Sequence, residues 1–330
     1  MSARTGDSEN PAVLVSSTTT GEPLTRTSHK VRTNDGWELD LLRVPAEGTV
    51  RGAALLAHAM MVDRRSMDRP SGGGFASHLA RAGWDVYLLD VRGHGASGPR
   101  AEEGGIWTYD DIVQRDLPAA VAAVRKRQEK GPVVVVGHSL CGHASPAAEG
   151  CGFYPRPPDA HVLLSANMWL PRLEPSWWRR RKKAFTTWLA SFISRSFGRF
   201  PSRLIRMGPA DEPRVYMEDI RRFWREDRWG SQDGQHDYLE GMKRVAGPVL
   251  SLVGAGDKLL AHPAGAANWA SYLGPETVDF RVMHRGSYGL EFDPDHMSLV
   301  TDLRARPAWD EVLRWMNSVR PLADVVQASE

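Results

Sequence analysis

The chain has 330 residues, of which 42% are hydrophobic and 25% are charged, and its formal net charge is +2. This composition is ordinary for a globular protein that buries a large core, and so small a net charge does not indicate nucleic acid as a partner. No apolar run reaches the roughly 20 residues of a membrane span. The first residues lack the pattern of a signal peptide, and two cysteines do not make a disulfide framework. These features predict a cytoplasmic protein.

The N-terminal part of the chain has no hydrophobic periodicity. Residues 1–25 are rich in Ser, Thr, Gly and Glu, which predicts a flexible tail. The next segment, SHKVRTNDGWELDLLRVPAEG (28–48), alternates between polar and apolar residues around Asn34-Asp35-Gly36. Such a turn between two alternating segments is typical of a β-hairpin.

Apolar runs and helical patterns then alternate as far as Ala166. We expect strands over residues 52–58, 84–90, 132–137 and 160–166, and helices over 72–83, 110–128 and from 140 onward. The strands are nearly continuous apolar runs separated by helices, which is typical of a parallel sheet buried on both faces. The predicted fold class is therefore α/β.

This alternation stops for a long segment and then returns. Residues 168–243 contain no comparable strand, but they hold six of the twelve tryptophans and a basic run at 179–183. Further strands are expected over 247–257 and 277–283, and further helices over 263–273 and about 307–319. We interpret residues 26–167 and 244–330 as one α/β core, and residues 168–243 as a helical cap or lid inserted between its halves.

The strand at 132–137 runs directly into Gly137-His138-Ser139-Leu140-Cys141-Gly142. A strand that ends in G-x-S and continues at once as a helix places the serine on a tight, strained turn. The backbone N–H groups of the helix N-terminus favour negative charge there, as an acyl-transfer oxyanion requires. We expect Ser139 to be a nucleophile, and the alternative is that it is an ordinary helix N-cap.

Cys141 is a rival nucleophile in the same motif. It lies two residues into the helix, about 200° around the axis from Ser139, and this direction points towards the sheet. Cysteine is small and is often buried as an ordinary hydrophobic residue. We therefore expect Cys141 to fill space where glycine is usual rather than to react.

A nucleophilic serine needs a base, and the base needs a group that orients it. Asp257 follows a predicted strand, and His296 lies between the last strand and the last helix, so both are expected at the edge where Ser139 lies. Each alone has an ordinary explanation as a turn, cap or surface residue, but three in the right order make coincidence improbable. The groups that compete less well are His138, His143, His262, His284 and Asp293.

Two backbone N–H groups are expected to form an oxyanion hole. One belongs to Leu140, the residue after the serine, and the other comes from the loop after the strand at 52–58. We expect Met60 to provide the second donor, with Ala59 as the alternative. Residues expected to contact the substrate are Ala59, Met61, His138 and Trp169.

These motifs together resemble the α/β-hydrolase fold superfamily over about residues 28–320, and within it lysophospholipase-like and monoacylglycerol-lipase-like hydrolases. The resemblance is carried by His58 with Met60, DVRGHGASG (90–98), GHSLCG (137–142), GAGD (254–257) and DPDHM (293–297). It implies Ser139 as nucleophile, Asp257 as acid and His296 as base, with a structural role for Asp90 and Arg92. It implies no metal or organic cofactor.

The chain departs from this pattern at three positions. Ala59 replaces the glycine of the usual His-Gly pair, Cys141 replaces the second glycine of the elbow, and Asp295 replaces a glycine that often precedes the histidine. None of these changes removes a catalytic group. Polyhydroxyalkanoate synthases use a cysteine nucleophile, but at the position that Ser139 occupies here, so their chemistry does not match.

In the predicted cap, WWRRRKKAFTTWLASFISRSFGRF (177–200) repeats its apolar residues at helical spacing. The repeat consists of Phe185, Trp188, Leu189, Phe192 and Ile193. The interpretation that we favour is a cap helix that packs on the core domain, with its basic end solvated. The alternative is an amphipathic lid that admits acyl chains or transiently touches an anionic membrane surface.

The expected function is a serine carboxylesterase or lipase acting on a small-molecule ester with an apolar acyl or aryl portion. An acyltransferase, amidase or thioesterase with the same triad is the alternative, because the acyl acceptor is chosen by the pocket and not by the triad. A non-catalytic binding protein on this fold is disfavoured, because binding alone would not require Ser139, Asp257 and His296. The oligomeric state and the acyl chain length are not determined by the sequence.

Overall fold

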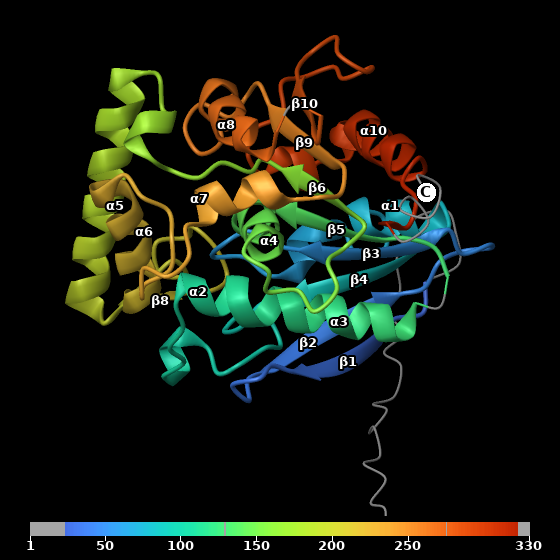
Figure 1. The fold of residues 1–330 in the computed structure, drawn as a ribbon, viewed down its shortest axis with the longest axis horizontal. Helices are drawn as coiled ribbons and strands as arrows, with labels where there is room; N and C mark the ends of the chain where they lie inside the picture. Colours follow the sequence, from blue (N-terminus) through green and yellow to red (C-terminus); the bar gives the residue numbers. More distant parts are fainter. Residues whose placement is uncertain (1–23, 129, 275, 323–330) are drawn as a thin grey trace, which may run out of the picture.

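The computed structural model describes residues 24–128, 130–274 and 276–322, so the predicted flexible tail lies almost entirely outside the described residues. An eight-stranded sheet has the order β1-β2-β4-β3-β5-β6-β9-β10 (Figure 1). The strands are β1 (Thr27–Arg32), β2 (Glu38–Val44), β3 (Gly52–Ala57), β4 (Trp84–Asp90), β5 (Val133–His138), β6 (Ala160–Leu164), β9 (Val249–Gly254) and β10 (Val278–Met283). Only the pairings β1–β2 and β2–β4 are antiparallel, so the sheet is mostly parallel as expected.

Both faces of this sheet are buried, as the apolar runs predict. In β5, Val133 and Val135 pack into one hydrophobic core, and Val134 and Val136 pack into the other. Successive side chains of a strand point to opposite faces. A continuous apolar run therefore supplies both cores at once.

Helices cover the two faces. The helices are α1 (Phe75–Arg81), α2 (Tyr109–Asp111), α3 (Leu117–Arg127), α4 (Leu140–Gly150), α5 (Trp177–Phe197), α6 (Arg214–Glu226), α7 (Tyr238–Gly241), α8 (Pro263–Ala270), α9 (Ser298–Thr301) and α10 (Arg306–Met316). Side chains of α1 and α10 belong to one core, and those of α3, α4 and α8 belong to the other (Figure 1). The helix predicted over 110–128 is one helical stretch, in which a π-helical turn (Ile112–Asp116) joins α2 to α3.

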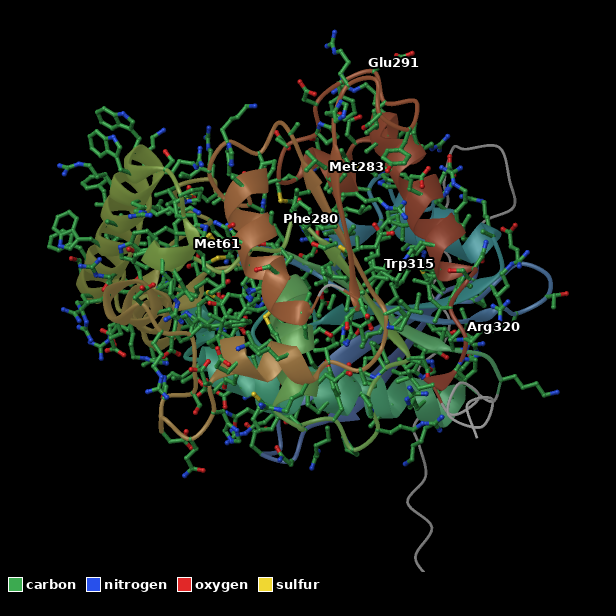
Figure 2. The ribbon with its side chains drawn as sticks, turned by 45° about the horizontal axis from the view of Figure 1, so that its top comes forward. Met61, Phe280, Met283, Glu291, Trp315 and Arg320 are labelled. Atoms are coloured by element: carbon green, nitrogen blue, oxygen red, sulfur yellow. The ribbon has the colours of Figure 1, made fainter. Side chains whose placement is uncertain are left out.

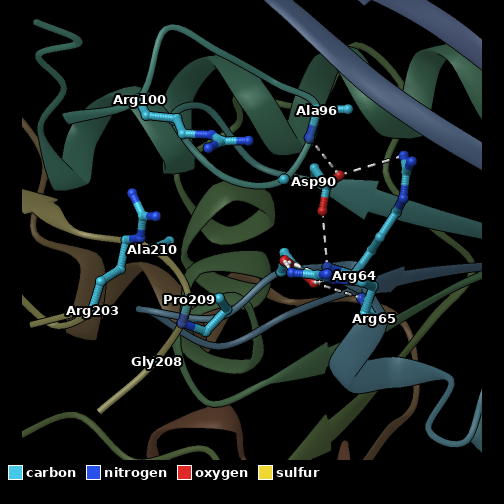
Figure 3. A pocket seen from close by; sticks show the side chains of 12 residues that line it. Arg64, Arg65, Asp90, Ala96, Arg100, Arg203, Gly208, Pro209 and Ala210 are labelled. Carbon is cyan, nitrogen blue, oxygen red and sulfur yellow. Dashed lines mark hydrogen bonds and ion pairs between the residues drawn. The ribbon is translucent and has the colours of Figure 1, made fainter. Parts of the chain in front are cut away.

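The loop after β4 contains the DVRGHGASG motif and is held by Asp90. The Oδ1 atom of Asp90 accepts from the Arg64 backbone N–H at 2.8 Å, and its Oδ2 accepts from that of Ala96 at 3.0 Å (Figure 3). Ser97 Oγ donates to the Asp90 carbonyl and accepts from the Asp40 N–H, both at 2.7 Å. The carboxylate and the hydroxyl thus replace the backbone pairing that a loop lacks.

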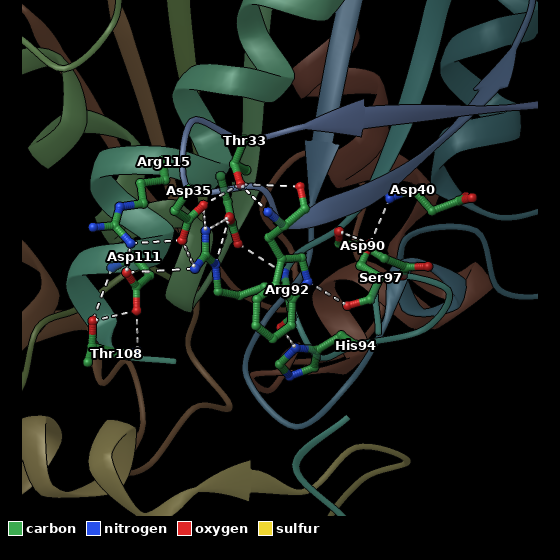
Figure 4. Close-up of polar contacts among 12 residues, drawn as sticks. Thr33, Asp35, Asp40, Asp90, Arg92, His94, Ser97, Thr108, Asp111 and Arg115 are labelled. Atoms are coloured by element: carbon green, nitrogen blue, oxygen red, sulfur yellow. Dashed lines mark hydrogen bonds and ion pairs between the residues drawn. The ribbon is translucent and has the colours of Figure 1, made fainter. Parts of the chain in front are cut away.

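Arg92 joins the same loop to distant parts of the core. It is buried, and its guanidinium donates to Asp116 Oδ1 at 2.8 Å and to Asp35 Oδ2 at 2.9 Å (Figure 4). Asp35 lies in the β1–β2 turn, and Asp116 ends the π-helical turn before α3. Asp90 and Arg92 are therefore structural residues of this chain.

The segment between β6 and β9 contains α5 and α6, which pack against each other at one end of the sheet (Figure 1). We call residues 168–230 the helical insertion. It also holds a short antiparallel ladder of β7 (Arg199–Phe200) and β8 (Glu212–Pro213), which the sequence analysis did not predict. Two residues per strand are too few to give a periodic signal. The predicted cap extends to residue 243, but α7 packs against α4 of the core, so the end of the predicted segment lies with the core.

α5 packs on the protein and most of its basic run is exposed, but its aromatic side chains do not make the contact. Its buried residues are Lys183, Thr187, Ser191 and Ser194, whereas its aromatic face is directed outward. The side chains on that face are 36–66% exposed, namely Trp177, Trp178, Phe185, Trp188, Leu189 and Phe192. Small hydroxyl side chains allow α5 to pack on α6, and Lys183 is neutralised by Glu174, whose Oε2 lies 2.8 Å from its Nζ. The helical periodicity of α5 identified its apolar face but did not show whether that face is buried or exposed.

The buried Arg92 gives a stability prediction. Arg92→Met should lower the free energy of unfolding by about 3–5 kcal/mol, because it leaves the carboxylate of Asp116 buried without its partner. Arg115→Met is the matched control, since Arg115 is a more exposed partner of Asp35 and Asp111. It should cost less than about 1 kcal/mol. Urea unfolding followed by tryptophan fluorescence measures both, and equal losses would contradict a structural role specific to Arg92.

Candidate active site

Ser139 lies at the junction of β5 and α4, in a strained conformation. Its φ of 50° and ψ of −104° are unusual for a residue with a Cβ. Its N–H donates to the Leu164 carbonyl at 2.9 Å, which ties the turn to β6. A Cβ at Gly137 would lie 2.4 Å from the Cys141 carbonyl, and one at Gly142 would lie 2.9 Å from the Ala166 Cβ. The turn therefore depends on glycine at both flanks, and the structure has the geometry that the elbow motif predicts.

Asp257 and His296 are brought together from separate strands. Asp257 follows β9, and His296 lies between β10 and α9, with its Nδ1 2.7 Å from Asp257 Oδ2. The backbone N–H groups of Leu259 and Ala261 also donate to the carboxylate. Burial alone would raise the pKa of Asp257, but the hydrogen bonds from His296 and from the two N–H groups lower it below the usual value. An ionised carboxylate accepts only, so Nδ1 of His296 carries a proton and Nε2 is the ring nitrogen left for another partner.

The ring of His138 binds the backbone of His296. It is fully buried, and its Nε2 lies 2.9 Å from the backbone carbonyl of His296, to which it donates. Burial, with a smaller effect of His296, lowers the pKa of His138 to about 3, so the imidazole is neutral. The prediction that His138 contacts the substrate does not agree with this position, because the ring is covered by the protein. Its place next to Ser139 in sequence suggested a site residue but could not show the direction of the ring.

The loop after β3 is held by His58. Its ring is fully buried, with Nδ1 2.7 Å from the Ala59 carbonyl and Nε2 accepting from the Val91 N–H at 3.2 Å. Burial and the neighbouring His94 lower the pKa of His58 to about 3, so the ring is neutral with its proton on Nδ1. Across the described residues, neither the Met60 N–H nor the Leu140 N–H has a hydrogen-bond acceptor.

The other residues expected at the substrate have different surroundings. Ala59 and Met61 are almost fully buried, and Met61 lies between the sheet and the helical insertion (Figure 2). Trp169 is partly exposed and donates from Nε1 to the Leu260 carbonyl at 2.8 Å, close in sequence to Asp257. The structure thus places Trp169 beside the loop of the acid, and Ala59 and Met61 in the wall of the loop after β3.

Sequence reasoning did not assign His143 and the aromatic residues around it. His143 lies one helical turn after Ser139, its Nδ1 is 2.9 Å from the Tyr109 hydroxyl, and its ring meets Trp229 edge-on at 5.9 Å. Burial, with a smaller effect of His296, lowers the pKa of His143 to about 3. The spacing of four residues from Ser139 was a usable signal for His143. Tyr109 and Trp229 come from distant segments and gave no signal.

Cys141 belongs to the hydrophobic core. Its side chain is fully buried among residues of α3, α4 and β5, and burial raises the pKa of its thiol strongly. A thiol without access to solvent and without a tendency to ionise is a poor nucleophile. Cys141 therefore fits where the motif usually has glycine because its side chain enters the core and not the turn.

A cavity of about 600 Å³ lies beside this region, but Ser139 does not line it (Figure 3). Four arginines face it, and three of them are paired with carboxylates: Arg64 with Asp40, Arg65 with Asp63, and Arg203 with Glu102. These pairs leave little unbalanced positive charge in the cavity.

Comparisons with known proteins agree with this fold. A triacylglycerol lipase 2 of Arabidopsis thaliana is 29% identical over 127 residues, which cover 34% of this chain and 30% of that protein. The human lysosomal acid lipase/cholesteryl ester hydrolase is 26% identical over 122 residues, which cover 33% of this chain and 31% of that protein. The chain thus matches only about a third of the length of these relatives. An esterase structure from Pyrococcus furiosus superposes with a TM-score of 0.60 at 16% identity, covering 96% of this chain and 100% of that one.

Among the described residues, no helix is both long enough and apolar enough to cross a membrane. The family comparison covers most of the chain, since the model of the serine aminopeptidase S33 family matches residues 71–295. The predicted fold and superfamily are thereby confirmed, and the chain belongs to the S33 serine aminopeptidase family of α/β hydrolases.

Proposed function

We propose that the protein is a serine ester hydrolase that forms an acyl-enzyme on Ser139. The observation that carries this proposal is the strained Ser139 turn at the N-terminus of α4, at the same sheet edge as the hydrogen-bonded pair of Asp257 and His296. A structural serine does not need a positive φ, which costs on the order of 1–3 kcal/mol and persists where function requires it. The lipase and esterase names of the relatives support the same reaction class.

Each residue has a definite role in the proposed reaction. Ser139 Oγ attacks the ester carbonyl while His296 Nε2 takes its proton, and the imidazolium then protonates the leaving alcohol. Asp257 holds the proton on Nδ1, which leaves Nε2 free to act as the base. The N–H groups of Met60 and Leu140 stabilise the oxyanion, and the loss of one such donor typically costs roughly 2.7–4 kcal/mol of barrier. Water then releases the acid by the reverse sequence of steps.

The proposed substrate is an ester with an apolar acyl or aryl portion. Trp169 and the exposed Leu260 stand beside the Asp257 loop and offer apolar surface there. Apolar walls with a few polar groups suit an apolar ligand. The matching family is named for an aminopeptidase, so hydrolysis of an amide is the competing activity. Acyl transfer and thioester cleavage use the same triad and remain alternatives.

We further propose that the helical insertion is a cap whose outer face touches an anionic lipid surface. Seven exposed apolar side chains of α5, the six named above and Phe197, lie on the same helix as the basic run at 179–183. In the segment between β7 and β8, Leu204, Ile205 and Met207 are also exposed, next to Arg203 and Arg206. Monomeric proteins rarely leave such apolar surface in water. Tryptophan, phenylalanine and arginine on one helix are the combination that interfacial helices use, and the positive charge selects an anionic bilayer over a second copy of this basic face.

The proposed nucleophile gives a direct prediction. Ser139→Ala should abolish labelling by a fluorophosphonate probe and lower kcat on p-nitrophenyl esters by about 10⁴-fold or more, because the group that forms the acyl-enzyme is lost. The matched control is Cys141→Ser, two residues away, which should retain labelling and keep kcat within about tenfold.

A panel of p-nitrophenyl esters and aminoacyl p-nitroanilides separates the reaction classes. Faster turnover of the anilides would favour an amidase over an esterase. A wild-type protein that neither labels nor turns over any substrate would overturn the proposal, and loss of activity in Cys141→Ser but not in Ser139→Ala would reverse the choice of nucleophile.

The proposed lipid contact predicts selective binding to vesicles. The wild-type protein should sediment with phosphatidylcholine vesicles that contain phosphatidylglycerol, and less with pure phosphatidylcholine. Trp188→Ser combined with Phe192→Ser should weaken the partition by about tenfold or more, because two large side chains no longer enter the interface. Leu303→Ser removes an exposed apolar residue beside α10 and serves as the control, with no change expected. Absence of binding, together with a stable dimer in light scattering that these substitutions dissociate, would show a second copy on this face instead.

A further inference from the structure

We propose that Glu212, which belongs to the helical insertion, is a positioning residue for the oxyanion loop (residues 58–61). This inference rests on the proposed function, because it concerns the backbone N–H that would stabilise the oxyanion. Glu212 lies in β8, directly before α6, more than a hundred residues from the loop in sequence. Its side chain is fully buried, and its Oε1 accepts from the Met61 N–H at 2.7 Å.

Two groups fix the peptides on either side of Met60. The carbonyl of Ala59 accepts from Nδ1 of His58 at 2.7 Å, and in a trans peptide the N–H of the next residue points the opposite way. The Met60 N–H is thereby turned away from His58. The following peptide is fixed by Glu212 through the Met61 N–H. The proposed donor is therefore held from the core by one side chain and from the insertion by the other.

Met61 itself has a conformation that needs support. Its φ is 63°, which a side chain with a Cβ rarely adopts. Besides the bond to Glu212, its carbonyl accepts from the Ala210 N–H at 3.1 Å. Gly208 lies against the same carbonyl, where a Cβ would be 2.1 Å away. The segment 208–212 thus contacts both the N–H and the carbonyl of Met61, and it holds a backbone that would otherwise relax.

A carboxylate so near an oxyanion needs its charge offset, and His94 provides this. His94 is fully buried, with Nδ1 2.8 Å from the Arg92 carbonyl and Nε2 3.1 Å from Glu212 Oε1. Both partners are acceptors, so both ring nitrogens carry protons and the ring is cationic. Burial alone would lower the pKa of His94, but Glu212 raises it above its usual value. The pair is neutral overall, so Glu212 can orient the loop without repelling the developing oxyanion.

The consequence is a mechanical link between the insertion and the chemistry. The insertion leaves the sheet after β6, at the edge that also carries Ser139, and the same insertion holds the peptide that would stabilise the transition state. A movement that withdraws the segment 208–212 releases Met61, and the Met60 N–H loses its fixed direction. Full transition-state stabilisation therefore requires the insertion to be seated on the core.

The experiment compares Glu212→Ala, Glu212→Gln and Asp211→Ala. Asp211 is the matched control, because it is buried in the same segment and binds Arg199 and the Arg203 N–H instead of the oxyanion loop. For each variant, kcat and KM are measured on one p-nitrophenyl ester, and the inhibition constant is measured for a trifluoromethyl ketone, which forms an oxyanion in the site.

Glu212→Ala should lower kcat by about 10- to 100-fold with KM within about threefold, because a misdirected donor loses part of the 10²- to 10³-fold that one oxyanion donor contributes. The inhibition constant should rise by a similar factor, a correlation that a general loss of structure does not produce. Glu212→Gln should restore most of the activity, since an amide oxygen still accepts from Met61. Asp211→Ala should stay within about threefold of wild type.

Equal effects of Glu212→Ala and Asp211→Ala, or a rise in KM with unchanged kcat, would overturn the inference. If Glu212→Ala does not fold, Gly208→Ala decides, because its Cβ displaces the Met61 carbonyl without removing the carboxylate. Wild-type kcat in that variant would also overturn it. An inactive, unlabelled wild-type protein would instead refute the proposed function, so the two failures are distinguishable.

Discussion

The shared direction of the central strands determines where the other features can lie. β4, β3, β5, β6, β9 and β10 run parallel, so their carboxyl ends form a single edge. The oxyanion loop follows β3, Ser139 follows β5, Asp257 follows β9 and His296 follows β10. These residues are far apart in sequence but share one edge, because each follows a strand that ends there. Helices cover both faces of the sheet, and the helical insertion begins at this same edge, after β6.

Much of this could be predicted from local signals. The Val-rich β5, the Asp-Gly turn after β1 and the helical repeat of α3 are short-range patterns, and the structure contains each of them. The order of Ser139, Asp257 and His296 predicted their common edge, because a parallel sheet leaves little choice. These predictions succeeded because each pattern depends on the sequence of a single strand, turn or helix.

The features that escaped prediction depend on contacts between distant segments. No pattern in residues 208–213 predicts that the buried carboxylate of Glu212 contacts Met61 and His94. Packing against α6 determines which face of α5 is exposed, and the hydrophobic periodicity of α5 alone does not show which face packs. The role of His138 likewise depends on the backbone of His296, a partner from the other end of the chain. In each case the signal is a tertiary contact and has no local pattern.

The buried histidines around the site divide into two kinds. Burial lowers the pKa of His58, His138 and His143 to about 3, so these rings are neutral and serve as fixed hydrogen-bonding groups. None of them would compete with His296, the proposed base, for the proton of Ser139. His94 is the exception, because Glu212 stabilises its charge. The candidate site thus combines three neutral buried histidines with one ion pair whose charges balance.

The cysteine at position 141 affects whether a search with the G-x-S-x-G motif detects chains of this kind. The close approach of helix and sheet falls on Gly142, against Ala166, while Cys141 fills space in the core. The residue that must be small is therefore Gly142, one position after the second glycine of the G-x-S-x-G motif, which Cys141 occupies here. A pattern search that demands glycine at both ends of G-x-S-x-G would pass over this chain. A search that asks for a small residue where the helix crosses the next strand would retain it, together with any relatives that have made the same exchange.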